Sequence, residues 1–411
     1  MTTKVLIVDD DPLNVRLVER VLSGETEEPY ELAIARDGHE ALRRAKEFRP
    51  DLIILDVMMP EMDGYEVCQR LRQDPETAHI LILLLTAHGS VESRIKGFQA
   101  GADDFLTKPF HPEELLVHIQ ALLRRRVILP VGHAGPKFVS RALAFFSLRG
   151  GVGTSTFATN VAVALAQLWQ TPVVLVDMVL ACGQSAMMLN QTLRHTWADL
   201  AEIPPQDCTV ELVEQVLIGH DSGVLTLAAP PSSEMAELVT PEIVSRVLEL
   251  LTSKYEYVIM DLPHDFQGTT LAALDRADQI VLVFTPEIMS VYATKRALDT
   301  LAMLDYADER ISLLMNWTFA KGGLAQRSIE SALGRSIDYV MPFAESLLVE
   351  TLNLGEPAVL RYRRKPLGAV LEDLAFYLSK PDHKESTPEH PSETWRSVQQ
   401  RQEQRRKRRK T

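Results

Sequence analysis

At residues 149–156 the chain reads Arg149-Gly150-Gly151-Val152-Gly153-Thr154-Ser155-Thr156. An apolar run at 143–146 precedes this segment, and a helical pattern of apolar residues follows it from 157 to 169. A glycine-rich turn between a strand and a helix can point backbone N–H groups at phosphate oxygens, with the positive end of the helix dipole behind them. We therefore predict an α/β domain with a phosphate-binding loop at 149–156.

The loop lacks the lysine that normally precedes its hydroxyl residue. In the complete motif that lysine reaches the β- and γ-phosphates, and here the short, neutral Thr154 stands in its place. Arg149 keeps a positive charge at the start of the loop, although a planar guanidinium is not equivalent to an ammonium. Glycine-rich turns also precede helices that bind no nucleotide, so the loop alone leaves a purely structural turn open.

The composition limits the classes of protein to consider. A chain of 411 residues is expected to form two or three domains, and its net charge of −13 gives no overall attraction to nucleic acid or anionic membranes. Cys68, Cys182 and Cys208 have neither C-x-x-C nor zinc-ligand spacing, which favours a reducing compartment. No run approaches the roughly 18 apolar residues of a membrane span, and no leader pattern is present. We expect a cytoplasmic protein without a transmembrane segment.

Short apolar runs alternate with helical patterns from Val5 to about residue 126, which predicts a doubly wound α/β domain. Four runs end at polar residues, namely Asp9 with Asp10, Asp56, Thr86 and Lys108. The carboxyl ends of parallel strands share one crevice, so these side chains should converge. Three carboxylates packed together call for a hard cation such as Mg²⁺. Asp56 can then attack phosphorus as a nucleophile while Lys108 neutralises the phosphoryl oxygens.

These residues resemble the receiver domain of two-component response regulators over roughly the first 125 positions. The matching motifs are Val8-Asp9-Asp10, Asp56-Val57-Met58-Met59-Pro60 with Asp63-Gly64, Thr86-Ala87 and Lys108-Pro109-Phe110. The resemblance implies that a sensor histidine kinase phosphorylates Asp56, and that Asp9, Asp10, Asp56 and the Met58 carbonyl hold Mg²⁺. It also implies that Thr86 and Lys108 contact the phosphoryl group and that Phe105 is the switch aromatic. Each residue alone would be an ordinary cap or a surface lysine, but their grouping at strand ends favours a site.

A second strand–helix alternation runs from 141 to about 380, so that the chain is expected to contain two doubly wound α/β domains. Strands are predicted at 173–176, 257–260, 280–284 and 311–315, and they end at Asp177, Asp261, Thr285 and Asn316. These residues should face the same crevice as the phosphate loop.

This second region resembles the MinD/ParA family of P-loop proteins, which carry lysines at the positions of Arg149 and Thr154. The resemblance implies a homodimer that binds ATP and Mg²⁺. It gives Ser155 as a direct metal ligand, Asp261 as the Walker B aspartate and Asp177 as the first aspartate of the switch region. Asn316 would lie near adenine, with a structural cap as the alternative, and Trp317 replaces the arginine often found next.

Two departures from the family pattern predict impaired hydrolysis. Thr154 replaces the catalytic lysine, and Val179 replaces the second switch aspartate. The loss of one electrostatic contact to the transferring charge typically costs about 3–4 kcal/mol. ATP binding can survive better, because the backbone amides, Ser155 and the metal remain.

The whole pattern most resembles the CpaE/TadZ group of pilus-assembly proteins, over about residues 1–380. The supporting motifs are Asp261-Leu262-Pro263-His264, the segment 277–286 and Leu352-Asn353-Leu354-Gly355-Glu356-Pro357. The resemblance implies a factor that positions pilus or secretion machinery, with recruitment to the inner membrane or a cell pole. Many members of this group have a degenerate receiver, whereas here it is intact, so a more general phosphorylation-controlled positioning factor stays open.

The remaining segments are a linker and a tail. Pro130, Gly132, Gly135 and Pro136 predict a linker at 127–140 between a receiver at 1–126 and the second domain at 141–380. Residues 381–411 contain three prolines and a cationic run at 401–410 without an apolar stripe, and we expect a disordered basic tail. Such a tail can bind nucleic acid, an anionic membrane or an acidic partner.

Two rival functions remain. The first is an active ATPase that cycles between monomer and dimer, and the second is a DNA-binding regulator that acts through the basic tail. Steady-state ATP hydrolysis by residues 140–380 and a salt titration against duplex DNA would distinguish them.

Overall fold

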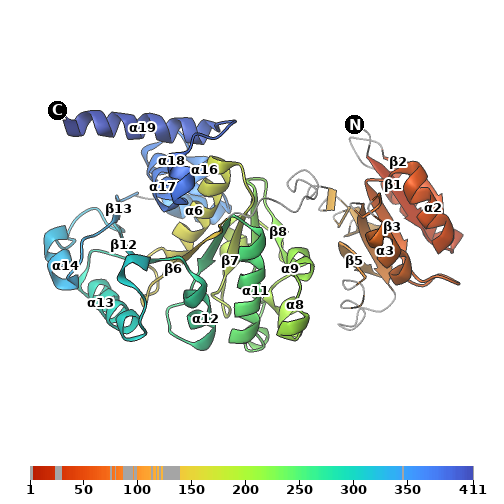
Figure 1. The fold of residues 1–411 in the computed structure, drawn as a ribbon, viewed down its shortest axis with the longest axis horizontal. Coiled ribbons are helices and arrows are strands. Elements are labelled where there is room, and N and C mark those ends of the chain that lie inside the picture. Colours follow the sequence, from red (N-terminus) through yellow and green to blue (C-terminus); the bar gives the residue numbers. More distant parts are fainter. Residues whose placement is uncertain are drawn as a thin grey trace. The chain divides into compact units, whose positions relative to one another are not determined.

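The computed structural model describes residues 3–23, 30–74, 76–78, 80–86, 96, 100–112, 114–116, 118–119, 122–123, 139–344 and 347–410. The chain divides into two compact units, Met1–Pro136 and Lys137–Thr411, which we describe separately (Figure 1). The predicted linker at 127–140 lies outside the described residues except for residues 139 and 140. No helix in the described ranges is long and apolar enough to cross a bilayer.

The first unit is a five-stranded parallel sheet with the strand order β2-β1-β3-β4-β5. Alternate residues of β1 enter opposite cores, with Val5 and Ile7 on one face and Leu6 and Val8 on the other, because successive side chains of a strand point to opposite sides. The sheet is therefore covered on both faces. Its elements are β1 (Lys4–Val8), α1 (Pro12–Ser23), β2 (Glu31–Ala35), α2 (Gly38–Phe48), β3 (Leu52–Asp56), α3 (Gly64–Gln73), β4 (Leu81–Thr86) and β5 (Asp104–Thr107).

The second unit is an eight-stranded sheet with the order β13-β12-β11-β6-β10-β7-β9-β8, parallel except for the β8–β9 pair. Its strands are β6 (Arg141–Phe146), β7 (Val173–Asp177), β8 (Ile218–Gly219), β9 (Val224–Leu227), β10 (Tyr257–Asp261), β11 (Gln279–Phe284), β12 (Ile311–Asn316) and β13 (Tyr339–Met341). Its helices are α6 (Thr154–Trp169), α7 (Ser185–Met188), α8 (Trp197–Ala201), α9 (Val210–Val216), α10 (Ser233–Ala236), α11 (Pro241–Lys254), α12 (Gly268–Arg276), α13 (Ile288–Met303), α14 (Gln326–Leu333), α15 (Leu347–Leu354), α16 (Ala358–Arg361), α17 (Pro366–Leu378), α18 (Pro381–Glu385) and α19 (Glu393–Lys410), with short 3-10 turns at Pro205–Asp207 and Asp308–Arg310.

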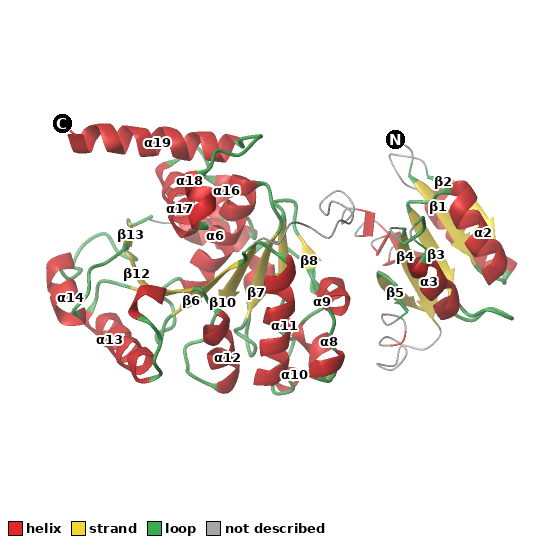
Figure 2. Cartoon of the chain, viewed as in Figure 1, coloured by secondary structure: helices red, strands yellow, loops and turns green. Residues whose placement is uncertain are grey.

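Helix α6 lies at the centre of this unit. It is apolar all round and packs between the sheet and α17, with Phe157, Val161 and Leu165 fully buried. A helix that is apolar on every side belongs in a core. Helices α6 and α17 cover one face of the sheet, and α11, α12 and α13 cover the other (Figures 1 and 2). The phosphate loop therefore begins at a rigidly held strand, β6, and ends at a rigidly held helix, α6.

The two predicted doubly wound α/β folds are confirmed. Strands β7, β10 and β12 end at Asp177, Asp261 and Asn316, as the sequence pattern predicts. Asp56 and Thr86 likewise close β3 and β4. Each sheet thus presents its polar residues at the carboxyl ends of its strands.

The expected disorder of residues 381–411 is wrong for the part that the structure describes. Residues 381–385 form α18 and residues 393–410 form α19. Helix α19 packs against α6 and α17 through the buried Val398 and the partly buried Trp395. Two apolar residues are too few for a recognisable stripe, and the remaining attachment is polar, which is why the composition suggested a free tail.

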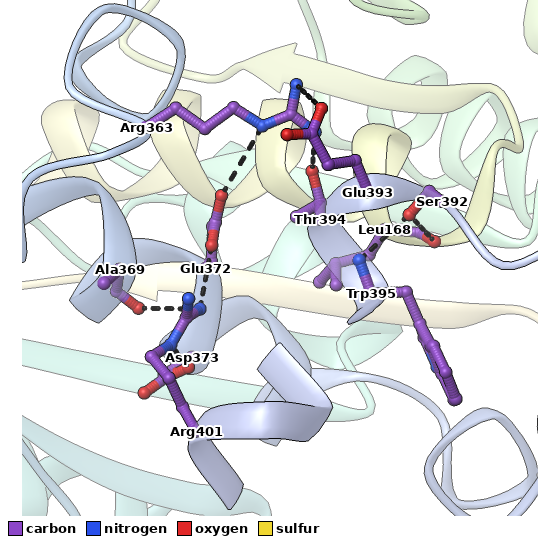
Figure 3. A network of polar contacts seen from close by, with 10 residues as sticks. All are labelled: Leu168, Arg363, Ala369, Glu372, Asp373, Ser392, Glu393, Thr394, Trp395 and Arg401. Atoms are coloured by element: carbon purple, nitrogen blue, oxygen red, sulfur yellow. Dashed lines mark hydrogen bonds and ion pairs between the residues drawn. The ribbon is translucent and has the colours of Figure 1, made fainter. Parts of the chain in front are cut away.

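The polar attachment of α19 neutralises two adjacent acids of α17 (Figure 3). Glu372 and Asp373 are buried, with relative exposures of only 1% and 3%. The Arg401 guanidinium donates to both, at 2.8 Å to Glu372 Oε2 and 2.8 Å to Asp373 Oδ1. Arg405 adds an ion pair of 2.8 Å to Asp373, and Arg363 lies 3.9 Å from Glu372. Charges out of water need such partners. The C-terminal helix is thus part of the fold of the second unit.

Replacing Arg401 by alanine should destabilise the second unit by about 3 kcal/mol, because two buried carboxylates lose their shared cation. The free energy of unfolding is measured by urea titration with tryptophan fluorescence, since all four tryptophans lie in residues 137–411. Arg396→Ala is the matched control, because Arg396 is an exposed arginine of the same helix, and it should change stability by no more than about 0.5 kcal/mol. Equal losses in both variants would refute the role of the acid pair.

Candidate phosphoacceptor and nucleotide sites

The first unit brings the predicted carboxylates together at the ends of β1 and β3. Asp9, Asp10 and Asp56 each offer an oxygen within 4.8 Å of the others. Lys108, after β5, reaches this cluster and donates to Asp9 Oδ2 at 2.9 Å and to Asp56 Oδ1 at 2.8 Å. Asp9 Oδ1 also accepts from the Asp11 N–H at 2.9 Å. Asp9 and Asp56 are buried and Asp10 is exposed, so the cluster opens to solvent on one side.

Burial sets the electrostatics of this cluster. It raises the pKa of Asp56, and the hydrogen bond from Lys108 offsets only part of this effect. Burial also disfavours the charge on Lys108, but the hydrogen bonds to Asp56 and Asp9 prevail and raise its pKa. Three carboxylates and one ammonium leave two negative charges. A divalent cation held by these hard oxygen donors would balance that charge, so the residues present fit Mg²⁺.

The other predicted receiver residues lie around the cluster. Thr86 is buried at the end of β4, where its side chain hydrogen bonds to that of Tyr65. Met58 is exposed, and its backbone N–H donates to Asp56. Phe105 lies on β5, partly buried against the core.

In the second unit the phosphate loop connects β6 to α6 and has a well-defined backbone. Gly151 and Gly153 adopt φ angles of +78° and +100°, which residues other than glycine rarely adopt. Among the described residues no side chain caps the N-terminus of α6, where Gly153 is the N-cap residue, so the first amides of the helix are available to an anion. The hydroxyl of Thr154 is buried without a hydrogen-bond partner among the described residues. Together these features fit a phosphate group.

Asp177 and Asp261 form a buried acid pair beneath the loop. The Ser155 hydroxyl hydrogen bonds to Asp261, and the Ser185 hydroxyl lies 3.5 Å from Asp261 Oδ2. Asp261 Oδ1 is buried without a partner in the described part of the chain. Burial raises the pKa of Asp177 to about 6 and raises that of Asp261 well above the ordinary value, with the charge of Asp177 as a further cause. A divalent cation near Ser155 and Asp261 would relieve this repulsion, so the donors fit Mg²⁺.

The remaining predicted residues have contacts that the sequence did not reveal. Asp177 shapes the segment after β7, because it accepts from the N–H groups of Val179 at 3.1 Å and Ser185 at 2.9 Å. Asn316 donates to the Val152 carbonyl at 2.9 Å, so it holds the loop as a structural clamp. The Arg149 guanidinium lies 2.7 Å from the Glu287 carboxylate. Gly150 is exposed, and Thr156 accepts from Asn160 at 2.8 Å.

Sequence reasoning missed three residues around the loop. Ser185 lies in no motif, and no sequence signal marks it. His264 ends the motif that begins at Asp261, but the motif does not indicate its contact with the loop, in which Nδ1 donates to the Ser147 carbonyl at 2.8 Å. Glu287 follows shortly after β11, so the rule that gathered the aspartates at strand ends would also have found it.

Comparisons with known proteins agree with this division. The model of the response regulator receiver domain matches residues 5–120, and the model described as cellulose biosynthesis protein BcsQ matches residues 141–316. Among curated proteins, the DNA-binding dual master transcriptional regulator RpaA of Synechocystis is 47% identical over 127 residues, covering 31% of this chain and 52% of RpaA. The response regulator MprA of Mycolicibacterium vanbaalenii is 38% identical over 197 residues, covering 48% of this chain and 80% of MprA.

Solved structures show the same fold for the second unit. A ParA family ATPase from Chlorobium tepidum covers 59% of this chain and 99% of its own, with a TM-score of 0.55 at 24% identity. The septum site-determining protein MinD from Pyrococcus horikoshii, solved with Mg-ADP, covers 61% and 100%, with a TM-score of 0.53 at 21% identity. At these identities the likeness establishes the fold alone.

Fold and site together define a receiver domain followed by a ParA/MinD-like α/β unit. The chain belongs to the response-regulator family, as its match to MprA shows. It spans only about half of the length of RpaA, the first of these relatives.

The acid pair should make stability fall as the pH rises. The pKa values of both acids are raised in the folded state, that of Asp177 to about 6, so their stabilising contribution is complete below the ordinary aspartate pKa and is lost as the pH rises through the raised pKa values. Asp261→Asn removes one buried charge and should therefore make the loss of unfolding free energy between about pH 5 and pH 8 smaller than in the unchanged protein. The free energy of unfolding of the unchanged protein and of Asp261→Asn is measured at each pH by urea titration in the presence of a chelator, with tryptophan fluorescence as the signal. Identical pH profiles would contradict it.

Proposed function

We propose that the protein is a phosphorylation-controlled response regulator whose ParA/MinD-like unit is its output. The observation that carries this proposal is the position of Lys108, which bonds to both Asp9 and Asp56 beside the exposed Asp10. This arrangement combines a nucleophile, a cation and metal ligands in one solvent-facing cluster. In this proposal a sensor histidine kinase supplies the phosphoryl group.

The phosphoacceptor reaction follows from these groups. An Asp56 carboxylate oxygen attacks the phosphorus atom of the donor, an acyl phosphate forms, and the bond from phosphorus to the donor breaks. Lys108 then exchanges its bond to Asp56 for one to a phosphoryl oxygen. Thr86 follows Leu85, the β4 residue that is paired with Asp56, and its hydroxyl is the second group proposed to contact the phosphoryl oxygens. Bound Mg²⁺, held by Asp9, Asp10, Asp56 and the Met58 carbonyl, would neutralise the remaining charge.

The second unit binds ATP with slow hydrolysis in this proposal. The preformed loop, the open N-terminus of α6 and the Ser155–Asp261 contact support binding. Thr154 offers only a hydroxyl where charge would be needed, and Val179 contributes a backbone N–H to Asp177 instead of a carboxylate. The unit then acts as a nucleotide-dependent binding switch that forms a homodimer. By resemblance to the CpaE/TadZ group, it positions pilus or secretion machinery at the inner membrane or a cell pole.

The retained Ser155–Asp261 contact also supports a second candidate, an active ATPase of the ParA/MinD type. Steady-state ATP hydrolysis by the full chain separates the two. Turnover comparable to that of ordinary enzymes, with a median of about 10 per second, would favour the ATPase.

A small phosphodonor with Mg²⁺ should label Asp56, and Asp56→Ala should abolish the label. Lys108→Ala should slow labelling on the order of 100-fold, because the incoming charge loses its cation. Glu61→Gln is the control, since Glu61 is an exposed acid of the same loop and should label normally. Intact-mass spectrometry after acid quench measures the label. Labelling that persists in Asp56→Ala would place the acceptor elsewhere.

Phosphorylation should change the dimer fraction. The added phosphoryl charge rearranges Lys108 and Thr86, and the linked β5 surface with Phe105 offers a contact between receivers that would raise the effective concentration of the output units. Analytical ultracentrifugation of labelled and unlabelled protein, with and without ATP, measures the dimer constant. An equal constant for fully labelled protein would exclude coupling through dimerisation, and recruitment of a separate partner would replace it.

A further inference from the structure

The phosphate loop is held in place by side chains from neighbouring strand ends. His264 donates to the Ser147 carbonyl at 2.8 Å, and Asn316 donates to the Val152 carbonyl at 2.9 Å. The Arg149 N–H also donates to the Ser147 hydroxyl at 3.2 Å. These hydrogen bonds hold the backbone of the loop, whereas the side chain of Arg149 is partly exposed and can change partner.

Arg149 is the one cationic side chain in the sequence from Ser147 to Asn160. Because Thr154 brings no charge to the loop, the positive side-chain charge that the loop itself offers to phosphate has to come from Arg149. A guanidinium can form two parallel hydrogen bonds to a phosphate. The direction in which Arg149 points therefore decides how much of this attraction is available.

Glu287 holds Arg149 in this structure. The Arg149 Nη2 atom lies 2.7 Å from Glu287 Oε1. The same carboxylate oxygen accepts from the Thr285 hydroxyl at 3.4 Å, which orients it at the end of β11. The side chains of Arg149 and Glu287 are 37% and 41% exposed, so solvent screens the pair and it can be exchanged for a stronger partner.

We propose that Glu287 sets the nucleotide affinity of the loop by competing with phosphate for Arg149. In the unliganded protein the pair Arg149–Glu287 keeps the guanidinium on the carboxylate. When a polyphosphate binds, Arg149 exchanges its ion pair with Glu287 for hydrogen bonds to the phosphate, and the Glu287 carboxylate is left in solvent. Glu287 is thus a residue that determines affinity, and this inference rests on the nucleotide binding proposed above.

The chain offers clean variants for a test. Glu287→Gln keeps the shape of the side chain and removes its charge, and it costs α13 no cap because Glu287 makes no side-chain cap hydrogen bond. Arg149→Gln removes the cation for which Glu287 and phosphate compete, and the double variant Arg149→Gln/Glu287→Gln completes the double-mutant cycle. Glu309→Gln, an exposed acid of the same unit, controls for the change in net charge. Thr154→Lys restores the usual lysine and tests whether the loop can bind ATP at all.

The measurement is the dissociation constant of ATP with Mg²⁺ for the full chain by isothermal titration calorimetry. We expect Glu287→Gln to bind roughly fivefold more tightly than the unchanged protein, and Glu309→Gln to bind equally. In the Arg149→Gln background, the gain from Glu287→Gln should fall below about twofold, because no guanidinium is left to release.

The possible failures are distinguishable. Equal affinity of the unchanged protein and Glu287→Gln would overturn the competition while nucleotide binding stands. A gain of the same size in the Arg149→Gln background would also overturn it, since Glu287 would then only repel the ligand. If the unchanged protein does not bind ATP, the proposed nucleotide binding fails, and the competition fails with it. Binding by Thr154→Lys alone would then assign that failure to the missing lysine.

Discussion

Buried carboxylates that need a cation govern both units of this protein. In the first unit, Lys108 supplies one positive charge to Asp9 and Asp56, and the remaining deficit fits a divalent metal. In the second unit, Asp177 and Asp261 face each other beneath the phosphate loop, and their hydrogen bonds come from hydroxyl and backbone N–H groups. In the same unit, Arg401 and Arg405 of α19 supply the positive charge that Glu372 and Asp373 of α17 need. Because desolvated charge is costly, each cluster ties local stability to the presence of its counter-charge.

These clusters differ in where their counter-charge comes from. The acids of α17 are paired with arginines of the same chain, so this cluster is part of the fold. The negative charge of the acids at the strand ends is balanced only in part by the chain, so these clusters favour a cationic ligand. The Arg149–Glu287 pair lies between these cases, because it is complete within the chain but exposed enough to be exchanged. The degree of burial and the source of the cation thus separate structural ion pairs from those that are suited to binding.

Much of the fold and part of the sites could be predicted from the sequence. Alternating apolar runs located the sheets, and the rule that ligands gather at the carboxyl ends of parallel strands predicted the grouping of Asp9, Asp56 and Lys108. The motifs also identified the loop between β6 and α6. Local pattern was sufficient here, because each of these residues is fixed by the strand that it terminates.

The rest depended on partners far apart in the chain. Arg149 and Glu287 are 138 positions apart, and nothing near Arg149 in the sequence indicates an acid beside it. The prediction of a disordered tail is wrong for the same reason, because Arg401 is held by Glu372 and Asp373 in another helix. This dependence also has a consequence for substitutions. Because Arg401 contacts both acids, the effects of changes at positions 372, 373 and 401 are expected to depend on one another, so that the C-terminal helix is energetically coupled to α17.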